Sequence, residues 1–313
     1  MKEGHLPVLA DEVLTMLAPA SGSLQIDATL GGGGHAERIL EATSPDGRLL
    51  GLDADGAAIA RVLERLARFG DRLVLRQANF RELATVAPAA GFDPADGLLF
   101  DLGLSSFQLA DAARGFGIRA GGSLDMRFDT RSGIPASELL ATLDAAELRA
   151  LFRKYGEEPH AGRIGRAIVD ARRTAPLATA EELVALVERV APAGTLGRRR
   201  IHPATRVFQA LRIAVNAELD ALEVALAAAV SLLRPGGRLV VLSYHSLEDR
   251  IVKQFMEAER KGCICPPVVP VCVCGRRPRL RLVGKSLAPS AAEVAANPRA
   301  RSARLRAAER IAA

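Results

Sequence analysis

The sequence predicts an α/β protein in which an open parallel sheet is interrupted by an inserted helical domain. Short apolar runs, each ending near a polar residue, alternate with helical patterns over residues 24–101 and again after residue 238. Residues 112–202 contain helical patterns and no strand pattern. At 313 residues the chain also exceeds an average domain. We therefore expect a discontinuous sheet domain (1–111 and 203–313) with an inserted helical, substrate-recognition domain (112–202).

The first strand pattern leads into a glycine turn. A helical pattern at 8–17 precedes the apolar run 24–27, which breaks into Gly31 to Gly34 before another helical pattern. Glycines allow positive φ and close backbone approach, and the N–H groups of a helix start face whatever binds there. The turn therefore predicts a site for a nucleotide cofactor.

The second strand pattern, 47–53, ends in Asp53. It follows the glycines by about the 20 residues at which an acidic side chain accepts hydrogen bonds from ribose hydroxyls. Asp53 has an alternative role as the N-cap of the helical run 57–69. Because Asp55 can cap that helix, Asp53 is left for the ligand.

The third and fourth strand patterns end in further candidates. The run 72–77 is followed by Phe80, which suits an adenine slot or the core. The run 97–101 ends in Asp101, and Ser105 and Ser106 follow it closely. The carboxyl ends of parallel strands share one edge, so these side chains should meet there.

The inserted domain should consist of short helices. Asp144 and Thr179 stand where two of them should begin, each with a glutamate three residues on. The helices are expected at 136–143, 145–155, 163–173 and 180–190, after an ordered glycine-rich loop at 115–134. The run Arg198 to Arg200 indicates a phosphate contact.

After the insert, one long helix is expected over 203–233, because apolar residues recur there at intervals of three and four. A strand at 238–243 then leads into Tyr244, His245 and another helix to about residue 260. The remaining tail is basic and amphipathic, which makes it a second candidate for phosphate contacts. Its arginines and lysine include Arg276, Arg277, Arg279, Arg281 and Lys285.

The four cysteines form two C-x-C pairs near the C-terminus, and the pattern leaves two alternatives open. Paired thiolates are typical of structural zinc sites, although their usual spacing is C-x2-C. The other alternative is four reduced thiols. The residues are Cys263, Cys265, Cys272 and Cys274.

Composition points to a cytoplasmic protein with no membrane segment. No signal pattern opens the chain, and no apolar run is long enough to span a bilayer. A net charge of +6 favours a polyanionic partner.

The glycine run is not a G-x-G-x-x-G, which counts against an oxidoreductase that uses NAD. S-adenosylmethionine needs no pyrophosphate cradle. It needs backbone near its carboxylate, an acid for its ribose, an adenine slot and an acceptor near its methyl group. Residues of the required kinds stand at the expected sheet positions, namely Gly33, Gly34, Asp53, Phe80 and Asp101.

Seven stretches in order resemble the bacterial small-subunit ribosomal RNA cytosine-N4 methyltransferases. They are HLPVL (5–9), DATLGGGGH (27–35), DLGLSSFQ (101–108), LDMR (124–127), HPATRVFQALRIAVN (202–216), SYHSLEDR (243–250) and NPRARS (297–302). The resemblance implies a Rossmann-like S-adenosylmethionine-dependent methyltransferase sheet. It also implies that the substrate is a cytidine in the decoding region of 16S rRNA, within the small subunit, with no obligatory protein partner inferred.

The family's cofactor contacts fall on Gly33, Gly34, His35, Asp53, Phe80, Asp101 and Gln108. His35 and Gln108 come from the resemblance alone. The cysteine pairs occur in only some members of the family, which argues against a catalytic metal.

The exocyclic nitrogen of cytosine is a poor nucleophile, so acceptors on its hydrogens should assist catalysis. Asp101, with Ser105 and Ser106, forms the expected acceptor set. His245 is either a proton acceptor or a hydrogen-bonding residue of the core. The acid-Pro-Pro-aromatic signature of other amino-methyltransferases is missing, which counts against a DNA substrate and leaves the stacking residue open among Phe107, Phe116 and Tyr244. A noncatalytic RNA-binding assembly factor is the remaining alternative.

Overall fold

The computed structural model describes residues 7–119, 121–191, 202–263, 265, 271 and 273–312. It divides into two compact units, Met1–Gly103 with Leu219–Ala313, and Leu104–Glu218. The second unit is thus wider than the expected 112–202, because the helix after residue 203 buries its apolar face in the core of the helical unit. Arg198 to Arg200 and Cys272 lie outside the described residues. Within the described ranges, no helix combines the length and apolar character needed to cross a bilayer.

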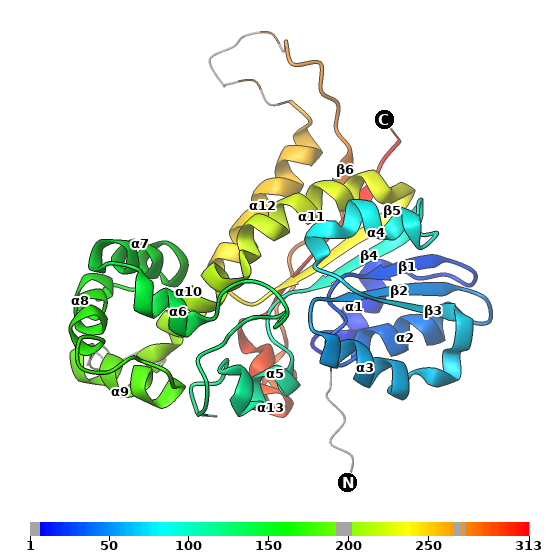
Figure 1. Ribbon diagram of the computed structural model, residues 1–313. Coiled ribbons are helices and arrows are strands. Elements are labelled where there is room, and N and C mark those ends of the chain that lie inside the picture. Colours follow the sequence, from blue (N-terminus) through cyan, green and yellow to red (C-terminus); the bar gives the residue numbers. More distant parts are fainter. Residues whose placement is uncertain are drawn as a thin grey trace. The chain divides into compact units, whose positions relative to one another are not determined.

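The first unit is built on a seven-stranded sheet of order β3-β2-β1-β4-β5-β7-β6 (Figure 1). Strands β1 to β5 are parallel, and β7 runs antiparallel to both β5 and β6. The strands are β1 (Leu24–Asp27), β2 (Arg48–Asp53), β3 (Leu73–Gln77), β4 (Ala95–Asp101), β5 (Leu233–Ser243), β6 (Leu280–Leu282) and β7 (Arg304–Arg310). The expected α/β sheet is confirmed.

Helices cover both faces of this sheet (Figure 1). Because successive side chains of a strand point to opposite faces, Leu49 of β2 packs with α1, α2 and α3, and its neighbour Leu50 with α4, α11 and α12. The continuous apolar runs of the sequence follow from this burial on two sides. The helices are α1 (Ala10–Leu17), α2 (Gly34–Ala42), α3 (Gly56–Arg65), α4 (Leu83–Ala89), α11 (Glu218–Leu232), α12 (Ser246–Lys261) and α13 (Ala291–Ala296), with 3₁₀ turns η1 (Ala67–Arg72), η2 (Phe80–Glu82) and η4 (Pro298–Ser302).

The second unit is helical and has its own core. Leu148, Phe152, Ile164, Leu183 and Leu211 are all buried in it. Its elements are α5 (Ser106–Ala110), η3 (Ala112–Arg114), α6 (Ala136–Thr142), α7 (Ala145–Gly156), α8 (Ala161–Ala171), α9 (Ala180–Val190) and α10 (Ala204–Asn216). The four expected short helices are therefore present.

One expectation about the C-terminal part was wrong, and two strands there were not predicted. The single helix over 203–233 is two helices, α10 and α11, separated at Ala217, whose φ is 47°. The sequence did not indicate this break, because the apolar residues keep the same spacing through both helices. Those of α10 pack in the core of the helical unit, and those of α11 pack against the sheet. The tail also supplies strands β6 and β7, which its arginines and alanines did not indicate.

The cap of α7 gives a first test of the helical unit. Asp144 Oδ1 accepts hydrogen bonds from the N–H groups of Ala146 and Glu147, both at 2.8 Å. Replacing Asp144 with alanine is expected to lower the free energy of unfolding by about 1 kcal/mol, because two N–H groups lose their acceptor. Urea unfolding followed by circular dichroism measures it. Asp144→Asn keeps an acceptor and should stay near wild type; equal stability of the alanine variant would contradict this role.

Candidate functional site

Three acidic side chains lie at the carboxyl edge of the sheet, where the strand order reverses between β1 and β4. Ligands of open α/β sheets bind in the crevice at such a reversal. Asp27 ends β1, Asp53 ends β2 and Asp101 ends β4. We call these three residues the acidic edge. Asp27 was not among the sequence candidates, although it ends its strand in the same way as the other two.

Asp53 ties the glycine turn to β2. Its Oδ2 accepts a hydrogen bond from Gly31 N and its Oδ1 one from Asp55 N, each at 2.8 Å. Asp55 caps the helix α3, because its Oδ1 accepts a hydrogen bond from Ala57 N at 3.0 Å. The expectation that Asp55 rather than Asp53 caps this helix is confirmed. A carboxylate has about four acceptor positions, so two of those on Asp53 remain for a ligand.

The glycine turn ends at Gly33, which precedes α2 with a φ of 76°. A Cβ at this position would be strained and would lie 3.0 Å from a methyl carbon of Val62. Gly34 is the first residue of α2, and His35 follows it with only 7% of its surface exposed. The turn therefore requires glycine at residue 33 and places His35 beside the end of β4.

Asp101 lies in a polar cluster within the first unit. Its Oδ1 accepts a hydrogen bond from Tyr244 Oη at 2.7 Å, and its Oδ2 lies 3.6 Å from His35 Nε2. Its backbone N–H donates to Thr29 Oγ1 at 2.5 Å. Tyr244, a stacking candidate in the sequence, thus orients the carboxyl group of Asp101.

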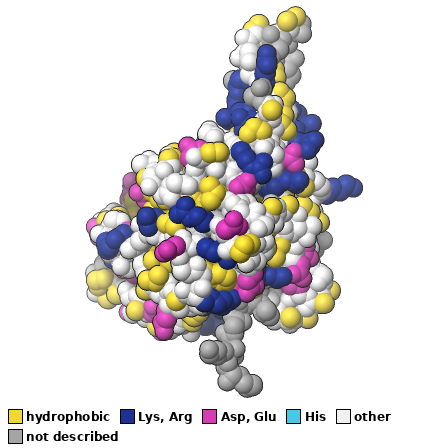
Figure 2. Space-filling view, turned by 90° about the vertical axis from the view of Figure 1, so that its right-hand side faces the viewer, with side chains coloured by type: hydrophobic (Ala, Val, Ile, Leu, Met, Phe, Trp, Pro, Cys, Tyr) yellow, Lys and Arg dark blue, Asp and Glu magenta, His cyan; other side chains and the backbone are white. Residues whose placement is uncertain are grey.

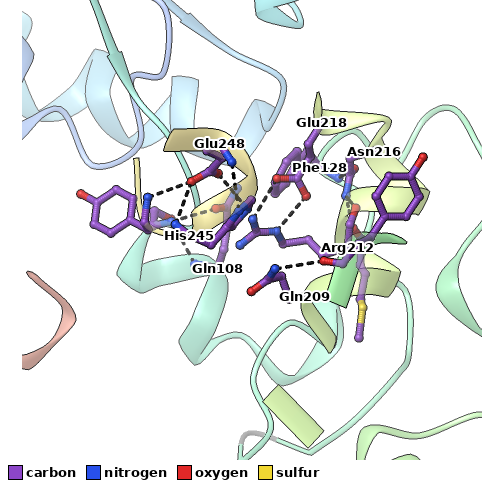
Figure 3. Close-up of polar contacts among 12 residues, drawn as sticks. Gln108, Phe128, Gln209, Arg212, Asn216, Glu218, His245 and Glu248 are labelled. Atoms are coloured by element: carbon purple, nitrogen blue, oxygen red, sulfur yellow. Dashed lines mark hydrogen bonds and ion pairs between the residues drawn. The ribbon is translucent and has the colours of Figure 1, made fainter. Parts of the chain in front are cut away.

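His245 is the N-cap of α12 and interacts with Glu248 (Figure 3). Its Nδ1 accepts from Glu248 N at 3.3 Å, and its Nε2 lies 3.1 Å from Glu248 Oε1. Glu248 Oε2 also accepts from Tyr244 N at 2.8 Å. The hydrogen-bonding alternative for His245 therefore has direct support, and its role as a proton acceptor stays a hypothesis.

Phe80 opens the short turn η2 just after β3. Its ring meets that of Phe100 edge to face, with centroids 5.9 Å apart, and packs on the core. An adenine contact by Phe80 stays a prediction.

The remaining sequence candidates belong to the second unit. Ser105 caps α5, with its Oγ accepting from Gln108 N at 3.2 Å, and Gln108 Oε1 accepts from Ser105 N at 3.0 Å. Ser106 is the first residue of α5, and Gln108 is buried. In the chain, Ser105 follows Asp101 by four residues. A role for these three side chains in binding or catalysis stays a prediction.

Asn216 holds the glycine-rich loop of the second unit (Figure 3). Its Nδ2 donates to Met126 O and its Oδ1 accepts from Phe128 N, both at 2.7 Å. Phe128 stacks on Phe116, which is 4% exposed, whereas Phe107 is 43% exposed. Phe116 is thus a core residue, and Phe107 is the more accessible stacking candidate.

Burial raises the pKa of every acid on the acidic edge. The pKa of Asp27 and of Asp101 rises to about 7, and that of Asp53 to about 6. Hydrogen bonds from backbone N–H groups or from Tyr244 lower each value only in part. Such a cluster favours a ligand that brings positive charge and hydroxyl donors to the carboxyl groups.

These raised pKa values predict a pH dependence of stability. Between the unfolded pKa near 4 and the folded values of about 6 to about 7, the folded chain binds more protons than the unfolded chain. The free energy of unfolding should therefore fall as the pH rises from about 5 to about 8. Urea unfolding across this range measures it.

Asp27→Asn provides the matched variant, because its amide oxygen can still accept the 3.1 Å hydrogen bond from Thr29 N. It should flatten the pH dependence. A slope as steep as that of wild type would rule out Asp27 as a source. Acids with lowered pKa values, such as Glu259, change the free energy of unfolding only at pH values below this range.

The chain matches a family model described as the MraW methylase family over residues 2–311. It is 58% identical over 309 residues to a ribosomal RNA small subunit methyltransferase H of Thermomicrobium roseum, covering 98% of this chain and 94% of that protein. Proteins of the same name from Syntrophotalea carbinolica and Geotalea uraniireducens are 50% and 51% identical, each covering 98% of both chains.

Proposed function

The chain belongs to the MraW methylase family, and from this we propose that it methylates the exocyclic N4 of a cytidine in the decoding region of 16S rRNA. It is an S-adenosylmethionine-dependent methyltransferase of small-subunit rRNA. The nucleotide, the subunit context and the residue roles are parts of the proposal. The observation that carries the roles is the oriented Asp101 on the acidic edge.

The acidic edge suits S-adenosylmethionine, which has a cationic sulfonium, a cationic ammonium and ribose hydroxyls. When bound, it supplies an electrophilic methyl carbon. In the proposal, Asp53 accepts from the ribose hydroxyls, Phe80 lines the adenine slot, and Gly33, Gly34 and His35 form the turn beside the methionine part. Asp101 and Gln108 complete the set of cofactor contacts.

Asp101 also acts on the nucleophile. Its carboxylate accepts a hydrogen bond from the N4 amino group and localises the nitrogen lone pair. When N4 takes up the methyl group it would lose one hydrogen as a proton, and the Asp101 carboxylate would accept that proton. Tyr244 holds the carboxyl group in place through its 2.7 Å hydrogen bond. Ser105 and Ser106 serve as further acceptors, and His245 is an alternative proton acceptor.

RNA binding is supported by charge. The chain has a net charge of +6, and Lys and Arg side chains gather around the protruding segment at the top of Figure 2. Four exposed basic residues of this segment are Arg260, Lys261, Arg276 and Arg277. Cationic side chains contact phosphates without reading sequence. We assign recognition of the target region to the helical unit.

The test is transfer of labelled methyl from S-adenosylmethionine to small subunits from cells that lack this protein, followed by nucleoside analysis of the RNA. N4-methylcytidine is the expected product. Another methylated nucleoside would overturn the proposed target. Cofactor binding without methyl transfer would favour the noncatalytic assembly factor.

A parallel reaction with duplex DNA in place of small subunits separates the substrates. We expect label in the RNA alone. Label of comparable amount in DNA would contradict the assignment to rRNA.

A further inference from the structure

Three cysteine thiols cluster in the segment between α12 and β6, outside the site described above. The Sγ atoms of Cys263, Cys265 and Cys274 all lie within 4.8 Å of one another. Those of Cys263 and Cys274 are 3.9 Å apart, although the two residues are eleven positions apart in the chain. The fold thus brings the first C-x-C pair and Cys274 of the second pair to one place.

The geometry of this cluster fits a tetrahedral thiolate site. A zinc ion holds sulfur ligands at about 2.3 Å, which places two ligands of a tetrahedron about 3.8 Å apart. The N–H group of Val273 points at Cys265 Sγ at 3.4 Å. Such a hydrogen bond to sulfur is typical of the groups that surround the ligands of a metal site.

The described residues of this segment are held firmly at its base, whereas those at its tip include exposed apolar side chains. Its base is fixed by Glu259, which is 4% exposed and binds Arg276 at 2.8 Å and Arg279 at 2.6 Å. At the tip, Val271 and Val273 are 71% and 80% exposed. These two valines contribute little buried apolar surface, and a structural metal ion is a source of stability for such a short segment.

We propose that Cys263, Cys265 and Cys274 bind a structural zinc ion that closes the tip of this segment. The proposal does not rest on the methyltransferase function. The helix α12 has 16 residues and so spans about 24 Å between Tyr244 and the cysteines, which excludes the ion from methyl transfer. Cys272 precedes Cys274 by two residues in the sequence, lies outside the described residues, and is tested below as a fourth ligand.

The experiment measures zinc in the full-length protein, purified without a histidine tag and in the presence of a reductant. Mass spectrometry of the metal should give about one zinc ion per chain. Cys263→Ser and Cys274→Ser should each weaken zinc binding by at least about tenfold, because each removes a ligand. Val273→Ser is the matched control: it changes the same exposed tip without removing a thiol, and should keep its zinc.

Two further readouts make the result independent of protein yield. Cobalt(II) should replace zinc and give the thiolate-to-metal absorption bands of a tetrahedral site, which Cys263→Ser should weaken. Removing zinc with a chelator should speed tryptic cleavage after Arg276, because the tip opens; the bond after Arg277 resists trypsin because Pro278 follows it. If Cys272 is the fourth ligand, Cys272→Ser will match Cys263→Ser, and if water or another group fills that position, it will match Val273→Ser; both results support the site.

Several results would overturn the proposal. Reduced protein without metal, in which the thiols react fully with a thiol reagent, would leave only reduced cysteines. Iron in place of zinc would make the metal assignment wrong. A disulfide between Cys263 and Cys274 in protein that never takes up zinc would identify a redox pair instead.

Discussion

Asp101→Asn is expected to lower kcat for methyl transfer to small subunits by about 100- to 1,000-fold. The amide is nearly the same size and its oxygen can still accept from Tyr244 Oη, so the local geometry is kept. An amide can neither take up the proton nor localise the nitrogen lone pair as a carboxylate does. The measurement is single-turnover methyl transfer, with cofactor affinity determined separately by calorimetry.

The control for Asp101 is Tyr244→Phe, which removes only the hydroxyl group. We expect a fall in kcat of about tenfold, the loss of one hydrogen bond to a charged group. Because this hydrogen bond lowers the pKa of Asp101, its loss should also move the acid limb of the pH–kcat profile to higher pH. A purely structural tyrosine would leave that limb in place. If Asp101→Asn retained kcat within tenfold of wild type, Asp101 would not be the acceptor.

Asp53→Asn is expected to weaken binding of S-adenosylmethionine by about ten- to a hundredfold. Both carboxyl oxygens of Asp53 accept backbone hydrogen bonds, at 2.8 Å from Gly31 N and Asp55 N. In asparagine an NH₂ group replaces one of these oxygens, and it cannot accept a hydrogen bond. One of the two backbone hydrogen bonds is therefore lost, the glycine turn shifts, and fewer acceptor positions remain for the ribose. Calorimetric titration measures the dissociation constant.

Asp55→Asn is the matched control, two residues further along the chain. Asparagine caps a helix about as well as aspartate, so α3 should keep its cap and cofactor affinity should stay near wild type. Equal loss of affinity in both variants would mean that the region responds as a whole, and the specific role of Asp53 would be wrong.

Much of the sheet unit could be predicted from the sequence, because its signals are local. Apolar runs over 24–27, 48–53 and 97–101 are buried on both sides of the sheet, and their ends carry the acids that form its carboxyl edge. The caps at Asp55, Asp144 and Thr179 each depend on a few consecutive residues, and all three are present. A helix cap needs no tertiary contact, so it can be predicted from the sequence.

Partners that are distant in the chain were decided by the tertiary structure. The hydrogen bond from Tyr244 to Asp101 joins residues 143 positions apart, and no sequence spacing indicates it. The break at Ala217 and the strand β7 likewise depend on what each segment packs against. The three cysteines depend on both the sequence and the fold. The sequence determined which thiols could bind a metal, and only the fold placed the Sγ atoms of Cys263 and Cys274 3.9 Å apart. Local patterns determine elements and ligand types, whereas packing determines which side chains meet.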